Sequence, residues 1–368
     1  MTQHWDPWSA GCSALSWDTG EGKHLFGRNF DFSRLAEGSG VSYVPRKTAY
    51  RLGGTELCQA RYAAAGMGFL EMPDTPILYE GINEKGLMGS QLYYRGFAHF
   101  PTELRPGTAP LEPPLAVYHL LAQCASVAEA AELVEQEVTL LGRPMLGTVP
   151  PLHWAFRDTT GETMVIEPDA DGVKLYRHTL GVMTNSPGYP WHRLNLLNYA
   201  GIRDLDYDGL ELEGERLEQC FSGSGAQGLP GDWSSPSRFV RLAFLKRFCA
   251  KGQGEEEAVT RLFRVMQSAA FPLGMVRVTE QGHVTQYDED VSPYDYTIYT
   301  AVMCGESLRY YWTTYENMRV QYVDLNQLMR RGEALQFPLE RQADFLQRQP
   351  EEGLAKKENC QGAQNIVE

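Results

Sequence analysis

The 368-residue sequence contains few cysteines and pairs none of them at close spacing. There are seven, spread along the chain at Cys12, Cys58, Cys124, Cys220, Cys249, Cys304 and Cys360. Because the number is odd and no C-x-x-C pair occurs, the pattern excludes a disulfide framework. Without the His/Cys spacing typical of zinc sites, it also predicts no metal centre. We expect reduced thiols, most of them acting as small core side chains.

Two kinds of targeting segment are missing as well. The chain has no apolar run of about 18 residues, the length that a membrane-spanning helix needs, so it predicts no transmembrane helix. The first eleven residues have neither a basic n-region nor an apolar h-region, so they do not form a secretory signal. We therefore expect a cytoplasmic protein.

Basic residues are in the minority. Lys and Arg number 33 against 47 Asp and Glu, which gives a formal net charge of −14. Proteins that bind nucleic acid need a basic surface, so this balance argues against such a partner. Hydrophobic residues make up 43% and charged residues 22%, which is typical of a globular protein with an ordinary core.

Several catalytic and cofactor motifs are absent too. The chain has no G-x-S-x-G elbow of serine hydrolases and no H-E-x-x-H pair of metalloproteases. Residues 223–228 do spell G-x-G-x-x-G, but Leu229-Pro230 follows and obstructs the helix that a dinucleotide loop must open. We expect a flexible loop there that borders a pocket, together with loops near 30–40, 72–77 and 142–150, and no cofactor.

The chain does contain strand and helix patterns in a mixed order. The expected strands are 12–18, 23–32, 86–94, 152–157, 163–167, 173–178, 180–184, 294–304, 308–314 and 319–323. The expected helices are two within 111–138, with a start signal at Ser126, and then 190–201, 236–250 and 255–268. This order indicates an α+β fold with a largely antiparallel sheet. We expect one domain, residues 12–335, and a polar, partly disordered tail, 336–368.

Six segments resemble, in order, the choloylglycine hydrolase family, whose N-terminal-nucleophile hydrolases include bile salt hydrolases and penicillin V acylases. They are residues 12–32, 78–87, 153–168, 182–187, 228–241 and 294–300, and the resemblance covers residues 11–330. It implies a cofactor-free hydrolase of linear amides. The fold that it implies is a four-layer α/β/β/α sandwich, with two antiparallel sheets between helix layers.

The resemblance also implies that residues 1–11 are a propeptide whose removal makes Cys12 the N-terminal residue. A free thiol has a pKa near ~8.5 and an α-amino group one near ~7.7–8.0, so the amine of Cys12 itself can take the thiol proton. Gly11 is small enough to let the thiol reach the preceding carbonyl, so self-cleavage is our hypothesis. Taken alone, a single cysteine in a strand is more often a buried core residue.

Three charged residues receive roles from the same resemblance. Arg28 would stabilise the Cys12 thiolate. Asp31 would hold the N-terminal amine, and Arg238 would close the polar network around Asp31. Each has an ordinary alternative, because Arg28 and Asp31 could form a surface ion pair of little energetic value, and Arg238 could be a helix-start residue that faces solvent.

Asn185 and Tyr93 complete the implied site. The Asn185 side-chain amide and the backbone N–H of Tyr93 would bind the oxyanion, although an Asn before Ser-Pro is also a common turn residue. Tyr93 resembles a position where bile salt hydrolases carry Asn and penicillin V acylases carry Tyr. An aromatic wall suits a phenoxyacetyl group, although a half-buried strand tyrosine is also common.

These observations predict a penicillin V acylase-like amidase that acts on a small-molecule amide. Conjugated bile salts are the alternative substrate, and N-acyl homoserine lactones or other N-acyl amides come next. Outside enzymes, the alternative is an inactive homologue that binds acyl ligands. The resemblance further implies a homotetramer.

Overall fold

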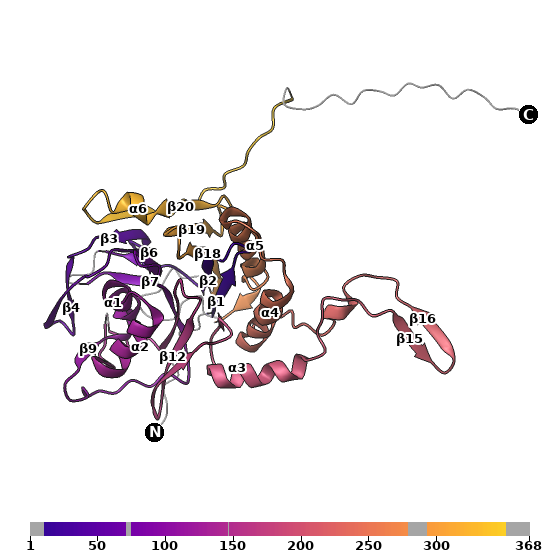
Figure 1. Ribbon diagram of the computed structural model, residues 1–368, viewed down its shortest axis with the longest axis horizontal. Coiled ribbons are helices and arrows are strands. Elements are labelled where there is room, and N and C mark those ends of the chain that lie inside the picture. The colour runs from indigo at the N-terminus through magenta and orange to yellow at the C-terminus, as the bar shows by residue number, and fades with distance from the viewer. Residues whose placement is uncertain (1–10, 71–74, 146, 279–292, 351–368) are drawn as a thin grey trace, which may run out of the picture.

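The computed structural model describes residues 11–70, 75–145, 147–278 and 293–350. The expected propeptide lies outside these residues except for Gly11, and so does the part of the expected tail from 351 to 368. Two large antiparallel sheets pack face to face, with helices on their outer faces (Figure 1). This is the four-layer α+β sandwich that the sequence led us to expect.

The first sheet is built around the strand that carries Cys12. That strand, β1 (Gly11–Asp18), pairs along its whole length with β2 (His24–Phe32), and β2 pairs in turn with β18 (Tyr294–Cys304). The order is β14-β1-β2-β18-β19-β20, with β17 beside β18, and the other bounds are β14 Val182–Met183, β19 Arg309–Thr314, β20 Gln321–Asp324 and β17 Val276–Arg277. Residues near both ends of the described chain therefore meet in this sheet.

The second sheet has eight strands in the order β13-β12-β11-β8-β7-β6-β3-β21. Their bounds are β13 Gly172–Arg177, β12 Thr163–Asp169, β11 Leu152–Arg157, β8 Met88–Tyr93, β7 Ile77–Asn83, β6 Ala64–Phe69, β3 Gly40–Val44 and β21 Leu335–Pro338. Three small pairs lie outside it: β4 (Ala49–Leu52) with β5 (Glu56–Gln59), β9 (Ala109–Leu111) with β10 (Val138–Leu140), and β15 (Gly209–Leu212) with β16 (Glu215–Glu218).

Helices cover the outer faces of the two sheets (Figure 1). Their bounds are α1 Ala116–Gln123, α2 Val127–Gln136, α3 Tyr189–Asn195, α4 Ser235–Phe248, α5 Glu255–Gln267 and α6 Leu325–Leu328. Apolar residues of α4 and α5 join the core around the first sheet, and those of α1 and α2 join the core behind the second. Helix α2 begins at the expected place, because the Ser126 hydroxyl accepts a hydrogen bond from the Glu129 amide at 3.2 Å. No helix in the described ranges is long and apolar enough to cross a membrane.

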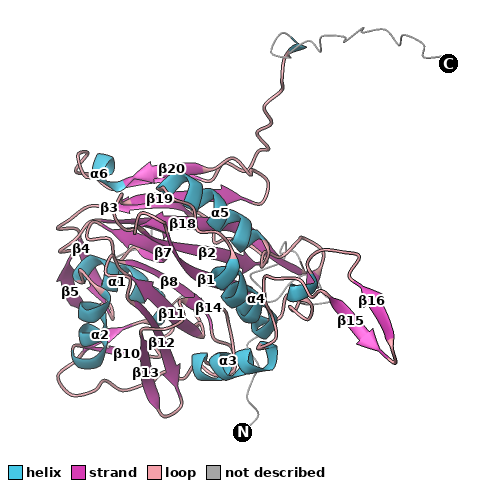
Figure 2. Cartoon of the chain, turned by 45° about the vertical axis from the view of Figure 1, so that its right-hand side comes forward, coloured by secondary structure: helices cyan, strands magenta, loops and turns pink. Residues whose placement is uncertain are grey.

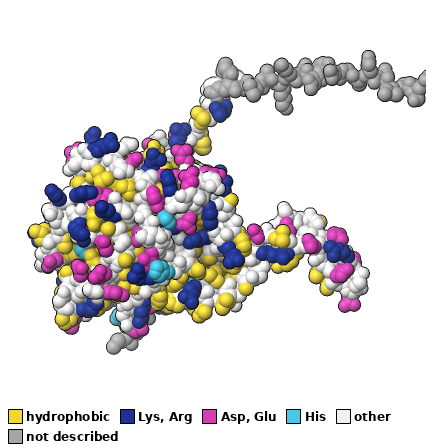
Figure 3. Space-filling model, in the orientation of Figure 1, with side chains coloured by type: hydrophobic (Ala, Val, Ile, Leu, Met, Phe, Trp, Pro, Cys, Tyr) yellow, Lys and Arg dark blue, Asp and Glu magenta, His cyan; other side chains and the backbone are white. Residues whose placement is uncertain are grey.

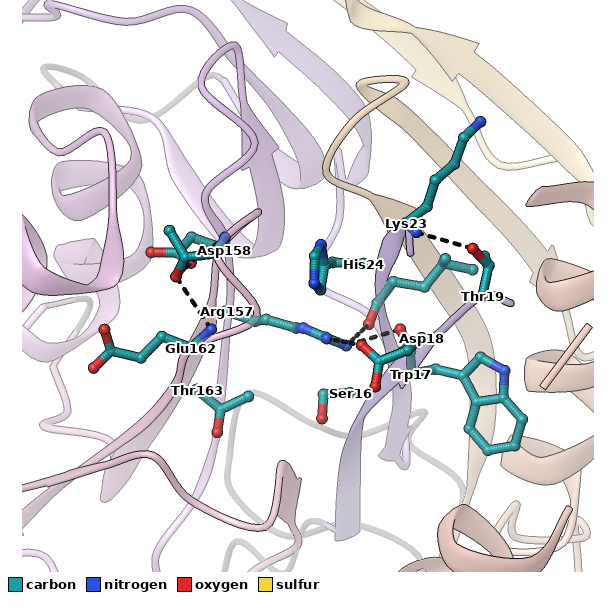
Figure 4. Close-up of polar contacts among 12 residues, drawn as sticks. Ser16, Trp17, Asp18, Thr19, Lys23, His24, Arg157, Asp158, Glu162 and Thr163 are labelled. Carbon is teal, nitrogen blue, oxygen red and sulfur yellow. Dashed lines mark hydrogen bonds and ion pairs between the residues drawn. The ribbon is translucent and has the colours of Figure 1, made fainter. Parts of the chain in front are cut away.

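One buried arginine ties the second sheet to the first hairpin (Figure 4). Arg157, the last residue of β11, donates from Nη1 to the carbonyl oxygens of Trp17 (2.8 Å) and Leu25 (2.9 Å). Its Nη2 pairs with Asp18. A buried guanidinium needs partners for its N–H groups, so this contact fixes how the sheets meet at the end of β1 remote from Cys12.

Several strands were not expected from the sequence, among them an exposed hairpin and an edge strand of the second sheet. The hairpin β15–β16 stands away from the sandwich as an arm, where no strand was expected (Figure 2). The boundary expected at residue 336 falls inside β21, which pairs with β3 as an edge strand of the second sheet. Polar composition concealed this strand, because an edge strand buries little of its surface.

Candidate active site

The register of the first sheet brings two expected partners to Cys12. In the pairing of β1 with β2, Cys12 lies opposite Phe30 and Ala14 lies opposite Arg28. Residues two apart on a strand share a face, so Cys12 and Arg28 point into the same space between the sheets. Asp31 lies further along β2, opposite Gly11. One hairpin therefore places three of the six expected site residues together.

The Arg28 guanidinium lies against the thiol. Its Nη2 is 3.4 Å from Cys12 Sγ and donates a 3.1 Å hydrogen bond to the carbonyl oxygen of Gln91. Cys12 is 2% exposed and Arg28 is 1% exposed. Burial raises the pKa of the Cys12 thiol, the positive charge of Arg28 opposes this, and the net pKa lies above the ordinary value. A proton acceptor beside the thiol is therefore needed to form the thiolate at neutral pH.

A buried carboxylate that the sequence analysis missed holds Arg28 in place. Glu80 Oε2 lies 2.9 Å from Arg28 Nη1, and Glu80 is 0% exposed. The hydroxyls of Tyr299 and Tyr310 donate to the same carboxylate at 2.8 and 2.6 Å. Burial raises the pKa of Glu80, and Arg28 and the two hydroxyls oppose this. The only local signal was a Glu in a strand whose neighbours are apolar, which does not identify its partner.

Asn185 and Arg238 meet the main chain of Cys12. The Cys12 N–H donates to Asn185 Oδ1 at 2.9 Å, and Arg238 Nη2 donates to the same oxygen at 2.6 Å. Arg238 also donates to the Cys12 carbonyl oxygen and to Ser13 Oγ. The Asn185 amide nitrogen donates to the carbonyl oxygen of Tyr93 at 2.8 Å. A side-chain amide has two N–H groups, so this bond leaves one for another acceptor.

Asn185 is itself held by two residues that the sequence analysis did not single out. Its backbone N–H donates to Ser235 Oγ and its carbonyl oxygen faces His192 Nε2, both at 2.9 Å. Burial lowers the pKa of His192 to about 4, so the ring is neutral at physiological pH. We place its proton on Nε2, because that nitrogen faces a carbonyl oxygen. Ser235 lies 50 residues from Asn185 in the sequence and His192 lies seven, so no common sequence spacing indicated these two contacts.

Asp31 has one carboxylate oxygen engaged and one without a partner in the described chain. Thr297 Oγ1 donates to Asp31 Oδ1, whereas Oδ2 is buried and has no hydrogen bond. Burial raises the pKa of Asp31 to about 6, and the charge of Arg238 opposes the rise. Arg238 therefore acts on Asp31 through its charge.

Asp31 predicts a pH dependence of stability in the chain that keeps residues 1–11. Its pKa of about 6 exceeds the ordinary 3.8, so the folded state holds the proton more tightly. The protonated carboxyl therefore adds up to about 3 kcal/mol to the free energy of unfolding. This contribution is complete below the ordinary pKa and is lost as the pH rises through the pKa of the folded state. The test compares two proteins that both carry Cys12→Ala, one with Asp31 and one with Asp31→Asn. We expect the free energy of unfolding of the first, relative to the second, to fall by about 3 kcal/mol between about pH 4 and about pH 6.5. Urea unfolding of both chains measures this, and a difference that does not change with pH would contradict it.

The cavity beside the thiol opens where β7 and β8 separate. These strands pair only from Glu80 with Ser90 to Ile82 with Met88, so Ile77–Tyr79 and Gln91–Tyr93 are not paired with each other. A cavity of about 220 Å³ lies there. Its lining is mostly aromatic and aliphatic, with Phe30, Phe32, Phe69, Ile77, Tyr79, Tyr93, Pro114, Met145, Pro150 and Leu152, and it includes Cys12, Arg28, Asp31, Arg34 and Gln91.

Three of the four expected pocket loops contribute to this lining, and the fourth does not. Segments 30–40, 72–77 and 142–150 each provide at least one lining residue. No residue of segment 221–230 is among the lining residues. That expectation was wrong because Asp206 binds the loop elsewhere, accepting hydrogen bonds from Gly223 N (2.8 Å) and Ser224 Oγ (3.1 Å) at the base of the arm.

No metal centre is found in the part of the chain that the structure describes. Nowhere in it do three His, Cys, Asp or Glu side chains gather closely enough to hold an ion. The polar groups around Cys12 are instead two guanidinium groups, one amide and one carboxylate. This set can stabilise a thiolate, orient a neighbouring amine and bind a developing oxyanion.

Comparison with known proteins identifies related chains. A family model, described as linear amide C–N hydrolases of the choloylglycine hydrolase family, matches residues 12–330. A bile salt hydrolase/transferase of Clostridium perfringens is 31% identical over 86% of this chain and 92% of its own length. A penicillin V acylase of Pectobacterium atrosepticum is 25% identical over 68% of this chain and 62% of its own length.

Solved structures are similar to this chain as well. Two of them are variants of the conjugated bile acid hydrolase from Clostridium perfringens, one with a cysteine changed to alanine and one with an arginine changed to leucine. They have TM-scores of 0.81 and 0.80 at 28% identity, and each match covers 91% of this chain and 99% of the other.

Proposed function

We propose that this chain, which belongs to the choloylglycine hydrolase family and is a linear amide C–N hydrolase, cleaves conjugated bile acids. Cys12 is the proposed nucleophile. The observation that carries the choice of substrate is the similarity to bile salt hydrolases, at 31% identity over 92% of the relative. The penicillin V acylase relative is matched over 62% of its length at 25% identity. Tyr93 alone had favoured the acylase, and the comparisons favour the alternative.

The proposed mechanism begins with attack of the Cys12 thiol on the Gly11 carbonyl, which forms a thioester and breaks the Gly11–Cys12 amide bond. Water then hydrolyses the thioester, which releases residues 1–11 and restores the thiol. The new α-amine takes the place of the Cys12 N–H, within reach of Asn185 Oδ1. Asp31 Oδ2, which has no other hydrogen bond among the described residues, is suited to bind that amine. The amine then accepts the thiol proton, and the thiolate is stabilised by Arg28. The family match begins at residue 12, which supports this start of the mature chain.

Attack of the thiolate on the substrate carbonyl would give a tetrahedral intermediate and then a thioester. The amine part of the substrate would leave after it takes a proton from the Cys12 α-ammonium. Water hydrolyses the thioester and releases the acid. The second N–H of Asn185 and the backbone of Tyr93 would bind the oxyanion. The cysteine and arginine changed in the two solved variants are sixteen positions apart, and so are Cys12 and Arg28, which supports their roles.

A second candidate substrate is favoured by the cavity. Its volume of about 220 Å³ and its aromatic lining suit a phenyl-sized acyl group such as phenoxyacetyl. Tyr93 stacks on Phe32 with ring centroids 5.9 Å apart, which forms one wall. Penicillin V is therefore the substrate to compare with a conjugated bile acid.

The test measures kcat/KM on glycocholate and on penicillin V with one preparation whose N-terminus is confirmed as Cys12. We expect a preference for glycocholate, in line with the bile salt hydrolase relatives. A preference for penicillin V would instead assign the aromatic cavity and Tyr93 the decisive role. Turnover of neither substrate would reject both candidates.

We also propose that the chain forms a homo-oligomer through the arm, in the tetrameric state that the family resemblance implies. Figure 3 shows the arm projecting from the body with hydrophobic side chains among the charged ones. Its exposed apolar residues, together with those of the preceding helical segment, are Leu194, Leu197, Leu205, Leu210, Leu212, Leu217 and Phe221. Light scattering after size exclusion tests this, and a monomer at micromolar concentration would contradict it.

A further inference from the structure

The cavity contains one buried polar group that the proposed reaction does not use. Gln91 and Tyr93 are two residues apart on β8, so they share a face of the sheet, and both line the cavity. Gln91 is 7% exposed, and its side-chain oxygen Oε1 is buried without a hydrogen-bond partner in the described chain. A carbonyl oxygen buried in this way is destabilising unless water or a ligand supplies the missing donor.

No residue in the part of the chain that the structure describes donates a hydrogen bond to Gln91 Oε1. The cavity wall is largely aromatic and aliphatic, and the hydroxyl of Tyr79 is already paired with Ser39 Oγ at 3.1 Å. The backbone oxygen of Gln91 is occupied by Arg28 Nη2, the same nitrogen that lies 3.4 Å from Cys12 Sγ. The Gln91 side chain therefore begins close to the thiol, within the cavity that would receive part of a substrate bound at Cys12.

We propose that Gln91 determines specificity by accepting a hydrogen bond from a hydroxyl or N–H on the acyl group of the substrate. This inference rests on the proposed function, because it assigns the acyl part of the amide to this cavity. Sites built around a buried polar group reject analogues that lack its partner far more strongly than apolar pockets reject a small change of size. We expect a preference of about tenfold or more in kcat/KM.

The test uses glycine amides that differ by one hydroxyl: phenylacetylglycine, its α-hydroxy analogue and its three ring-hydroxylated analogues. The proteins are the wild type, Gln91→Met and the control Gln321→Met. Gln321 lies on β20, outside the cavity lining, and also has a buried amide atom without a partner. At least one hydroxylated amide should exceed the parent by about tenfold or more in the wild type and in the control. Gln91→Met should cleave all five at rates within about twofold of one another.

Calorimetric binding of the five free acids to the same proteins repeats the comparison without turnover. A wild type with no preference for a hydroxyl, or a Gln91→Met variant that keeps it, would overturn the proposal. If no amide is cleaved but the acids show a preference that depends on Gln91, the proposed function fails and this inference stands. A second variant, Gln91→Glu, keeps an acceptor oxygen and should keep the preference even if Gln91→Met does not fold.

Discussion

Replacing Cys12 with alanine is expected to lower kcat/KM on the amide substrate by on the order of 10⁴-fold or more, the effect typical of losing a nucleophile. Alanine has no atom that can form the acyl-enzyme. The variant should also keep residues 1–11, because the same thiol is proposed to cleave the chain after Gly11. The fold should persist, since only one small buried atom is removed. Intact mass and steady-state kinetics on glycocholate measure both effects.

Cys124→Ala is the matched control. Cys124 is also 2% exposed, but it lies in the core between the second sheet and its helices. We expect kcat/KM within about threefold of the wild type for this variant, because only packing changes. Substantial turnover by Cys12→Ala, with Cys124→Ala unaffected, would reject the assignment of the nucleophile.

Arg28→Leu is expected to cost both stability and activity. Arg28 and Glu80 form an ion pair at 2.9 Å, and both are at most 1% exposed. Removing one partner of a buried pair leaves the other charge uncompensated, which typically costs about 3–5 kcal/mol in the free energy of unfolding. The thiolate also loses the positive charge that lies 3.4 Å from Sγ, so kcat/KM should fall by roughly 10²-fold or more.

The double variant Arg28→Leu/Glu80→Gln separates these effects. Neutralising Glu80 should restore most of the stability, because no unpaired charge remains buried. Activity should stay low, since nothing replaces the guanidinium at the thiol. Urea unfolding and kcat/KM on both variants provide the comparison. Recovery of activity in the double variant would show that Arg28 acts only through folding.

The sequence predicted strands best where apolar runs end in turn residues. The strands β11 and β18 have the bounds expected for them, 152–157 and 294–304. The strands β3 to β7 were missed, and β6 shows why. Its sequence Ala-Ala-Gly-Met-Gly-Phe has low strand propensity, but a Cβ at Gly66 or Gly68 would collide with backbone oxygens of β7. Close packing of neighbouring strands therefore required residues that concealed the strand.

Some contacts of the candidate active site could also be predicted from the sequence, and others could not. The hairpin that joins Cys12 to Arg28 could be predicted, because strand alternation and a short turn determine which residues face each other. Asp31 lies near Cys12 because the same register places it opposite Gly11. Glu80 and Gln91 could not be predicted, because they reach Cys12 through the packing of the second sheet against the first. Tyr93 lines the cavity, but one wall residue does not determine the substrate.

The most direct test of the central claim is the N-terminal residue of the active protein, read by Edman degradation and intact mass on a preparation that turns over glycocholate. We expect a chain that begins with Cys12 and loses activity when that thiol is alkylated. An equally active chain that still begins at Met1 or Thr2 would contradict it, because the Cys12 nitrogen would then be an amide and could not accept the thiol proton.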